Sequence, residues 1–258
     1  MFVSDHNRSV IDQFTRQAVP FARAEFHRDE EALAQIIRVA SPQKTDRVLD
    51  IACGPGIISC AFAPHVAEVT GADITPAMLV QAEKRRVESG LAPIRWVEAD
   101  AERLPFADAS FDLVVTRYSF HHLVAPLSVL KEMKRVCRPG GKILVVDVIP
   151  PGNKAIAYDM METLRDPSHT HALTRAELSM MFREAGLIET DYATHGVEVE
   201  LEAQLANSFP NPGDADRIRE IFRDEPECDT LGVNARRAAG KTYFTYPTGV
   251  ALARVAKN

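Results

Sequence analysis

One stretch near residue 50 constrains the fold of this chain more than any other. Residues 47–58 read RVLDIACGPGII. The apolar run ends in Asp50, and a turn around Gly54 and Gly56 leads into a helix-like segment. A strand that passes through such a turn into a helix points backbone N–H groups at a ligand, and glycine keeps side chains out of the way. A short glycine turn alone is common in α/β proteins, so the residues beyond the turn decide its meaning.

Strand-like apolar runs alternate with helical patterns from residue 47 to about residue 150. This alternation predicts βαβ units and a parallel sheet. Thr75 is expected to cap the second helix, with Pro76 in its first turn. The expected strands are 48–51, 66–72, 94–98, 111–116 and 142–148, and the expected helices between them are 57–63, 75–89 and 125–137.

Two regions flank the predicted core, which spans residues 41–150. Residues 7–40 read as helices, so residues 1–40 are expected to form an N-terminal helical cap on a single domain of residues 1–258. Residues 150–173 lack clean periodicity, and with residues 200–240 they are expected to form lid elements on the substrate side. The later elements expected are a helix at 174–185 with a capping box and a stop at Gly186, an antiparallel strand pair at 189–199 and 241–255, and a helical stretch at 201–223 broken at 211–213.

Composition excludes several classes of function. A net charge of −6 over 258 residues argues against a nucleic-acid partner bound through its phosphates. The four cysteines show no C-x-x-C spacing, which favours neither zinc nor a disulfide framework. The first residues do not resemble a signal peptide, and the longest apolar runs are strand-sized. A cytoplasmic protein without membrane insertion is therefore expected, and a homodimer stays open.

Acidic residues come after the second and third expected strands. Asp73 lies about twenty residues beyond the glycine turn, where a carboxylate accepts hydrogen bonds from both hydroxyls of a ribose. Its alternative role is to cap the helix near Thr75, but the spacing favours the ribose. Met78, one turn into that helix, suits either the face of a purine or the core. Asp100 could accept from an adenine amine while the N–H of Ala101 meets a ring nitrogen; alone it reads as a surface turn, but in register with Asp73 it favours the base.

Five segments, in this order, resemble the class I S-adenosylmethionine-dependent methyltransferases. They are VLDIACGPG, GADITPAM, EADAERLPF, FDLVVTRYSFHHL and RVCRPGGKILVVD, and they cover residues 47–148. Within that class the chain is most similar to the small-molecule group that includes the ubiquinone/menaquinone-biosynthesis C-methyltransferases. The sequence after Gly56 lacks the third glycine of the dinucleotide fingerprint, which argues against a nicotinamide cofactor.

The resemblance implies an α/β fold: a doubly wound, seven-stranded, mostly parallel sheet of order 3-2-1-4-5-7-6, with strand 7 antiparallel and helices on both faces. It also implies S-adenosylmethionine as the cofactor. The chain departs from the pattern at Ala52, where many relatives have glycine, and at Phe21, where many carry a tyrosine near the cofactor carboxylate. The cofactor contacts expected on this basis are Gln17, Phe21, Asp50, Ala52, Cys53, Gly54, Gly56, Asp73, Ile74, Met78, Asp100, Ala101, Glu102, Arg117 and His122.

The segment after the fourth expected strand carries His121 and His122, at the sheet edge where ligands bind. Adjacent helical residues do not share a face, so one ring is expected at the transfer site and the other to pack or to contact cofactor. Relatives that methylate hydroxyls place a histidine here with an aspartate ending strand five, which Asp147 matches. The catalytic candidates are therefore His121, His122 and Asp147, and a structural role for the pair is the alternative. Arg117 is expected to neutralise the cofactor carboxylate or an acidic substrate, or to pair with Asp50 or Asp147.

The acceptor is expected to contact Tyr118 and the segment 150–173, where Asp166, His169 and His171 cluster. Two histidines without an evident third ligand make a poor metal site, so no metal is expected.

These features predict an enzyme that transfers a methyl group from S-adenosylmethionine to a small organic acceptor by in-line displacement. The alternative keeps fold and cofactor but acts as a non-methylating cyclase or binding protein. A nucleic-acid methyltransferase is disfavoured by the acidic charge and by residues 116–119, which lack a proline-plus-aromatic motif.

Overall fold

The computed structural model describes residues 4–23, 29–92 and 94–257, so residues 1–3 and 24–28 of the predicted helical cap lie outside the described part. One sheet runs through the molecule in the order β3-β2-β1-β4-β5-β8-β6, with β7 paired to β8. Strands β1 to β5 are parallel, and β8 is antiparallel to both neighbours. The strands are β1 Arg47–Ile51, β2 Glu68–Asp73, β3 Arg95–Glu98, β4 Phe111–Arg117, β5 Cys137–Val148, β6 Leu187–Glu200, β7 Arg236–Ala238 and β8 Lys241–Val255.

This order confirms the expected 3-2-1-4-5-7-6 topology, in which β8 is the antiparallel seventh strand. The short β7 was not predicted; it forms a hairpin with the start of β8. The helices are α1 Asp5–Arg23, α2 Glu30–Ala40, α3 Ile57–Phe62, α4 Pro76–Glu88, α5 Pro126–Val136, α6 Ala155–Arg165, α7 Arg175–Glu184, α8 Leu201–Ser208 and α9 Asp214–Cys228, with single 3₁₀ turns η2 Ala63–His65 and η3 Phe120–His122.

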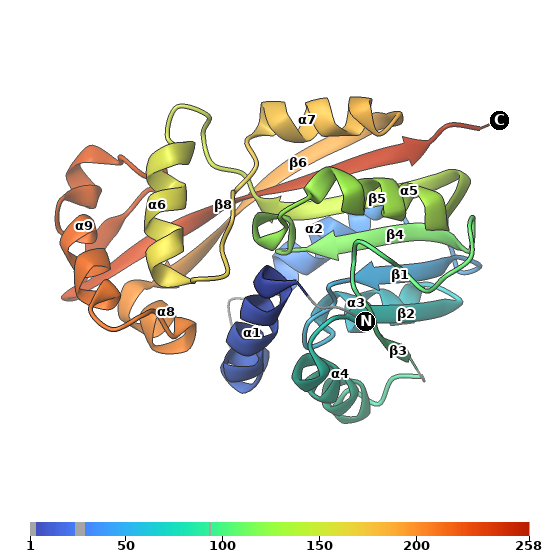
Figure 1. Ribbon diagram of the computed structural model, residues 1–258, viewed down its shortest axis with the longest axis horizontal. Helices are drawn as coiled ribbons and strands as arrows, with labels where there is room; N and C mark the ends of the chain where they lie inside the picture. Colours follow the sequence, from blue (N-terminus) through green and yellow to red (C-terminus); the bar gives the residue numbers. More distant parts are fainter. Residues whose placement is uncertain (1–3, 24–28, 93, 258) are drawn as a thin grey trace.

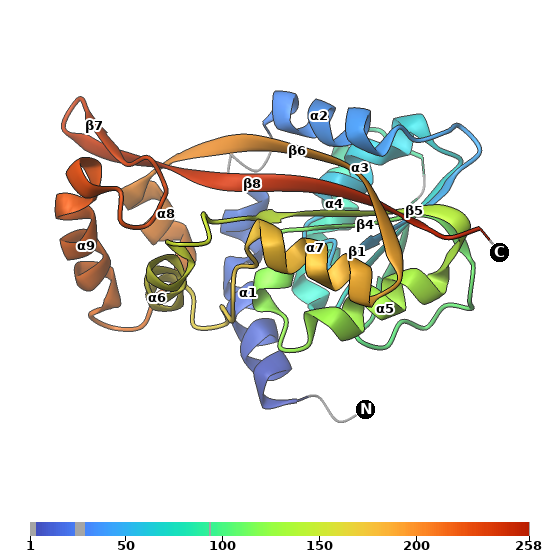
Figure 2. The same cartoon turned by 90° about the horizontal axis from the view of Figure 1, so that it is seen from above.

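Helices cover both faces of the sheet, α2 and α3 on one side and α5 and α7 on the other (Figure 2). Side chains alternate along β4, so Leu113 and Val115 face the α2 side while Val114 faces the α5 side. Ile36 of α2 is fully buried against the first face, and Leu130 of α5 against the second. Two apolar layers thus hold the central strands rigidly and fix where their carboxyl ends lie.

The antiparallel pair of β6 and β8 extends beyond the rest of the sheet (Figure 1). β5 pairs with β8 only over residues 248–254, whereas β6 pairs with β8 as far as Tyr243. Helices α6, α8 and α9 pack on this extension, and α1 lies between them and the core (Figure 1). We call their shared interior the outer cluster, which consists of Val148, Tyr158, Met161, Ala172, Val197, Val199, Leu201, Leu205, Ile218, Phe222, Leu231, Val233, Phe244 and Tyr246.

The structure corrects two local expectations. Residues 150–173, read as lacking periodicity, contain α6, whose inward face carries the charged Glu162 and Arg165 beside Tyr158 and Met161. A charged pair on the buried face breaks the apolar repeat by which a helix is identified. Thr75 occupies the cap position of α4, but its side chain makes no capping hydrogen bond.

Other late elements match the sequence. Thr174 caps α7 in a complete capping box with Glu177, as expected. The predicted break at 211–213 separates α8 from α9. Among the described residues, no helix combines the length and the apolar character that crossing a bilayer requires.

Candidate active site

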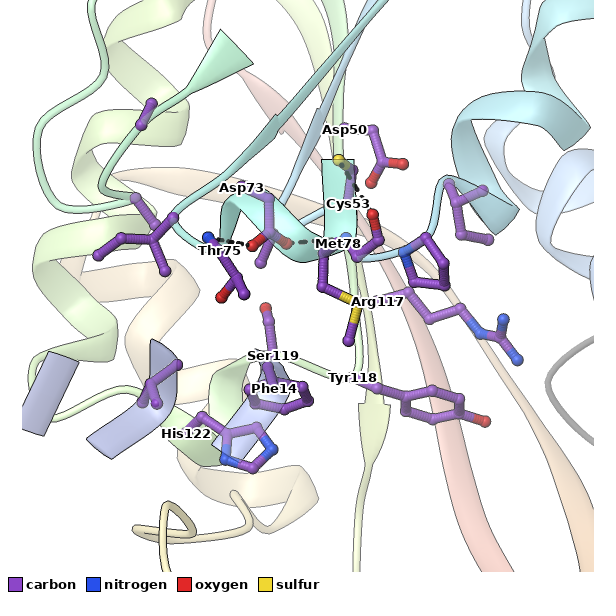
Figure 3. Close-up of a pocket in the computed structure, with 18 of the residues that line it drawn as sticks. Phe14, Asp50, Cys53, Asp73, Thr75, Met78, Arg117, Tyr118, Ser119 and His122 are labelled. Atoms are coloured by element: carbon purple, nitrogen blue, oxygen red, sulfur yellow. Dashed lines mark hydrogen bonds between the residues drawn. The ribbon is translucent and has the colours of Figure 1, made fainter. Parts of the chain in front are cut away.

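A cavity of about 120 Å³, here called the first cavity, opens at the carboxyl ends of β1, β2 and β4. Parallel strands bring their carboxyl ends to one edge, and α1 crosses above it. Phe14 and His122 lie on the side of the cavity opposite Asp50 and Asp73 (Figure 3). The lining residues are Asn7, Val10, Phe14, Phe21, Asp50, Ala52, Cys53, Gly54, Pro55, Ile57, Ile58, Asp73, Ile74, Thr75, Met78, Ala99, Asp100, Ala101, Arg117, Tyr118, Ser119, His122 and Leu123.

The two glycines of the turn after β1 serve different purposes. Gly54 has φ +51°, and a Cβ built on it would meet nothing within 4 Å, so its backbone faces open space. A Cβ on Gly56 would come 2.9 Å from the Trp96 ring and 3.0 Å from Ala82. Gly56 therefore permits close packing of the turn against α4 and β3, and it does not line the cavity. Ala52 adopts a left-handed φ of +51°, which explains why glycine suits this position in relatives.

Asp73 links the turn after β1 to the start of α4. Its Oδ2 accepts a hydrogen bond from Gly54 N and its Oδ1 from Thr75 N, each at 2.8 Å (Figure 3). Burial raises the pKa of this carboxyl although both hydrogen bonds favour the charged form. The carboxylate thus combines the helix-start contact considered from the sequence with a position on the cavity wall, and each oxygen keeps a lone pair for a ligand.

Asp50, at the end of β1, is 1% exposed and accepts a hydrogen bond from Ser59 Oγ at 2.6 Å. Burial raises its pKa to about 7, which the hydrogen bonds of Ser59 and the charge of Arg117 only partly oppose. The Arg117 guanidinium lies over the ring of Tyr118, 4.5 Å from its centroid. Asp50 is thus a carboxyl that a bound cation would ionise fully.

The loop after β3 closes another side of the first cavity. Asp100 Oδ2 accepts from Asn7 Nδ2 of α1 at 3.0 Å, and Oδ1 accepts from Glu102 N at 2.9 Å. Ala101 also lines the cavity, whereas Glu102 points to solvent and does not. Asn7 was not anticipated, because its partner lies 93 residues away in the sequence.

A second cavity, of about 70 Å³, adjoins the first. Phe14, Phe21, Tyr118 and His122 line both, so the two form neighbouring compartments under α1. Gln17, expected near the cofactor, lines only the second. The remaining residues around the second cavity are Gln17, His121, Val148, Glu162, Arg165, Asp166, Val197, Gln204, Asn207, Ser208 and Tyr246.

His121 lines the second cavity and forms a buried pair with Asp147, which does not line it. His121 Nδ1 lies 2.5 Å from Asp147 Oδ1, and Asp147 Oδ2 accepts from Phe120 N at 2.7 Å. Burial alone would lower the pKa of His121, but the charge and hydrogen bond of Asp147 outweigh it and raise the pKa above the usual value. Burial alone would raise the pKa of Asp147, but the charge and hydrogen bond of His121 lower it below the usual value. Because the carboxylate accepts from Nδ1–H, the proton-accepting nitrogen of neutral His121 is Nε2.

His122 is electrically different from its neighbour. Its pKa falls to about 3, because of burial and then the adjacent His121 charge. The two ring centroids are 4.2 Å apart within η3, and both rings border the second cavity. The two rings thus lie against each other rather than on separate faces, and the division of roles expected for them stays a prediction. His122 also packs edge-on against Phe14 and lines the first cavity.

Charged residues of the second cavity lie near the two histidines; Asp166 was expected there from the sequence, whereas Glu162 and Arg165 were not. Glu162 and Arg165 form an ion pair with both carboxylate oxygens 3.0 Å from Arg165 Nε. Asp166, 1% exposed, accepts from Ser168 N at 2.9 Å and from Gln17 Nε2 at 3.3 Å. The spacing of Glu162 and Arg165 on one helix turn was the available signal. Their burial depends on α8 and β8, which are distant in sequence.

His169 and His171 do not line either cavity. Asp159 of α6 binds both: its Oδ1 lies 2.8 Å from His169 Nε2 and its Oδ2 lies 2.6 Å from His171 Nδ1. These two hydrogen bonds hold the segment after α6 against that helix. Of the expected acceptor contacts, only Tyr118 and Asp166 line the second cavity. Within the described ranges, no group of three or more metal-binding side chains is arranged to hold an ion.

Comparison with known proteins identifies the family. A family model described as a methyltransferase domain matches residues 49–145. YcgJ of Bacillus subtilis, described as an uncharacterized methyltransferase, is 31% identical over 212 residues, covering 79% of this chain and 83% of that protein. This chain is a class I S-adenosylmethionine-dependent methyltransferase. S-adenosylmethionine is accordingly its cofactor.

Further relatives agree on the fold and differ in described activity. The UbiE C-methyltransferase of ubiquinone/menaquinone biosynthesis from Ectopseudomonas mendocina is 38% identical over 129 residues, 48% of this chain and 50% of that protein. A Bacillus halodurans structure described as a proposed methyltransferase has a TM-score of 0.80 at 27% identity, covering 87% of this chain and 99% of that one. The [4+2]-cyclase SpnF, with a TM-score of 0.59 and 19% identity over 88% of this chain and 81% of that one, shares the fold alone.

Proposed function

We propose that this methyltransferase binds S-adenosylmethionine in the first cavity and methylates a small organic acceptor in the second. The observation that carries the proposal is the His121–Asp147 pair, buried beside a cavity that shares four lining residues with the cofactor side.

The residues of the first cavity suit the cofactor end by end. Asp73 would accept from the ribose hydroxyls, and Asp100 and Ala101 would meet the edge of the adenine. Met78, 1% exposed, would lie against the adenine face. Arg117 would lie near the cofactor carboxylate.

Asp50 would receive the cofactor's ammonium group. Because burial raises the pKa of Asp50 to about 7, a cation beside the carboxyl would stabilise its charged form. Gly54, whose backbone faces open space, allows the ligand to approach the turn closely.

When bound, S-adenosylmethionine would supply an activated methyl group, because a nucleophile can bond to the methyl carbon as the carbon–sulfur bond opposite it breaks and leaves a neutral thioether. The chain's own contribution is to hold the acceptor in that line between the two cavities, and to remove a proton from it. His121 Nε2 would take that proton, and Asp147 would stabilise the resulting imidazolium, as its hydrogen bond to Nδ1 already fixes the tautomer.

The test is the formation of S-adenosylhomocysteine from S-adenosylmethionine in the presence of a panel of phenols, quinols, amines and thiols. Turnover with at least one acceptor, strongly reduced in His121→Ala, supports the proposal. If the chain binds the cofactor but forms no S-adenosylhomocysteine with any of these acceptors, the result supports the non-methylating alternative. A His121→Ala enzyme that transfers methyl groups at the parent rate contradicts the role of the base.

A further inference from the structure

We propose that the molecule held in the second cavity is uncharged or cationic, and that it donates a hydrogen bond to Oε1 of Gln204. This inference rests on the proposed function, in which the second cavity holds the acceptor. It extends that function by naming the chemistry of recognition and a residue responsible for it.

Gln204 lies on α8 with 8% of its surface exposed and lines the second cavity. Its Nε2 donates to the Tyr246 hydroxyl at 3.0 Å, whereas its Oε1 has no hydrogen-bond partner among the described residues. A buried amide oxygen without a partner is costly, and such groups in native proteins are usually satisfied by something. Since this oxygen belongs to a residue on the cavity wall, a ligand's O–H or N–H is the partner that fits.

The neighbouring network fixes which end of the amide is left over. The Glu162 carboxylate of the ion pair with Arg165 can only accept, so the Tyr246 hydroxyl donates its one proton to Glu162 Oε1, at 3.5 Å. The Tyr246 oxygen must then accept from Gln204, which requires the Nε2 end. With the amide reversed, one hydroxyl proton would have to serve both Glu162 and Gln204. The free atom is therefore an acceptor, and it calls for a donor.

The charges around the second cavity exclude an anionic ligand. Carboxylates of Asp147, Glu162 and Asp166 outnumber the cations of Arg165 and protonated His121 by one, and by two when His121 is neutral, as a base must be. Of the described lining residues, Arg165 is the only arginine or lysine, and Glu162 already binds it through both oxygens. A carboxylate or phosphate would enter a site with excess negative charge and no cation to pair with.

Four aromatic side chains also line the second cavity, namely Phe14, Phe21, Tyr118 and Tyr246. Small aromatic probes therefore suit the test: phenol, benzylamine, anisole and benzoate, which differ in one substituent. Phenol and benzylamine carry a donor, anisole only an acceptor, and benzoate a negative charge. Binding of each to the full chain loaded with S-adenosylhomocysteine is measured by calorimetry or by ligand-observed NMR.

We expect phenol and benzylamine to bind at least about tenfold more tightly than anisole and benzoate. Anisole would leave Gln204 Oε1 unpaired, and benzoate would bring a further negative charge to the cavity. Gln204→Leu should reduce phenol binding to the level of anisole. Gln204→Glu, which keeps an oxygen at this position, should retain phenol binding and strengthen benzylamine binding. Gln35→Leu, the same change on α2 far from the cavity, is the matched control.

The affinity for S-adenosylhomocysteine, unchanged across the variants, verifies that each is folded. The inference is overturned if none of the four probes binds, if anisole or benzoate equals phenol, or if Gln204→Leu leaves the phenol-to-anisole ratio unchanged. Because the readout is binding, it separates the two proposals. Gln204-dependent phenol binding without formation of S-adenosylhomocysteine with any acceptor would refute methyl transfer and leave the recognition intact.

Discussion

Asp147 Oδ1 lies 2.5 Å from His121 Nδ1, and the same carboxylate accepts backbone hydrogen bonds from Ser119, Phe120 and Val148. Both partners are at least nine-tenths buried. The carboxylate is therefore fixed by the backbone around the end of β4 before it orients the imidazole, which is the arrangement that a positioned base requires.

Removing the base should affect turnover and leave cofactor affinity alone. We expect His121→Ala and Asp147→Asn to lower single-turnover rates by about 10² or more, the usual contribution of general-base catalysis. The affinity for S-adenosylhomocysteine should stay within about twofold, since Asp147 and His121 do not line the first cavity. His65→Ala, on η2, is the control histidine. Parent-like rates in both variants would contradict a general base and would mean that methyl transfer depends on the positioning of donor and acceptor alone.

The rate should rise with pH. His121 accepts a proton only when neutral, and the net effect of burial and Asp147 is to raise its pKa above the ordinary value of 6.5. The rate is therefore expected to be low below this raised pKa and to climb through it. In Asp147→Asn the charge that raises the pKa is gone, so the midpoint of the remaining activity should move to lower pH. A profile of kcat against pH measures both, and a midpoint that stays in place or moves upward contradicts the assignment.

Cofactor binding should depend on Asp73. Asp73→Ala removes the ribose acceptor and the hydrogen bonds to Gly54 N and Thr75 N, so we expect affinity to fall by at least about tenfold. Asp73→Asn keeps one acceptor oxygen and should lose less. Isothermal titration with S-adenosylmethionine measures the change, and circular dichroism reports the fold. Unchanged affinity would remove Asp73 from the ribose role.

Relief of backbone strain should stabilise the chain. Ala52 has φ +51°, a region that costs an L-residue about 1 kcal/mol or more relative to glycine. Part of that gain is offset by the greater freedom of glycine in the unfolded state, so Ala52→Gly should raise the free energy of unfolding by about 0.5 kcal/mol. The comparison is Ala63→Gly, at φ −50°, which should lower it. Urea denaturation distinguishes the two signs.

Breaking the buried Glu162–Arg165 ion pair should lower the free energy of unfolding strongly. Glu162→Gln leaves the 9%-exposed Arg165 with Asp166, 4.0 Å away, as its remaining counter-charge, and we expect a loss of about 3 kcal/mol in the free energy of unfolding. Glu198→Gln, which breaks an exposed pair with Arg236, should cost less than about 1 kcal/mol. Equal losses would mean that the buried pair is screened as a surface pair is.

The cofactor half could be read from the sequence because its signals are local. Strand β1, the glycine turn and Asp73 lie within about thirty consecutive residues, and a βαβ unit leaves little freedom in how they meet. Asp147 was proposed from the resemblance, through its place at the end of the fifth expected strand, and its catalytic role stays a prediction.

The acceptor half could not be predicted in the same way. Gln204, Tyr246 and Glu162 meet only because the long β6–β8 strand pair brings α8 and β8 to α6, so residues more than 40 positions apart come into contact. Moreover, the buried face of α6 includes Glu162 and Arg165, which interrupt the apolar periodicity by which a helix is recognised. His169 and His171 illustrate the converse: a cluster in sequence that Asp159 holds away from both cavities.

The outer cluster has an evolutionary consequence. Within the described part of the chain, it has no buried residue in common with the two apolar clusters that flank the central strands. Substitutions among its members can reshape the wall around Gln204 while most residues of the donor-binding half keep their packing; Tyr118, which lines the first cavity, packs against the outer cluster. New acceptors can thus be acquired by drift in the projecting arm, with the methyl-donor machinery inherited unaltered.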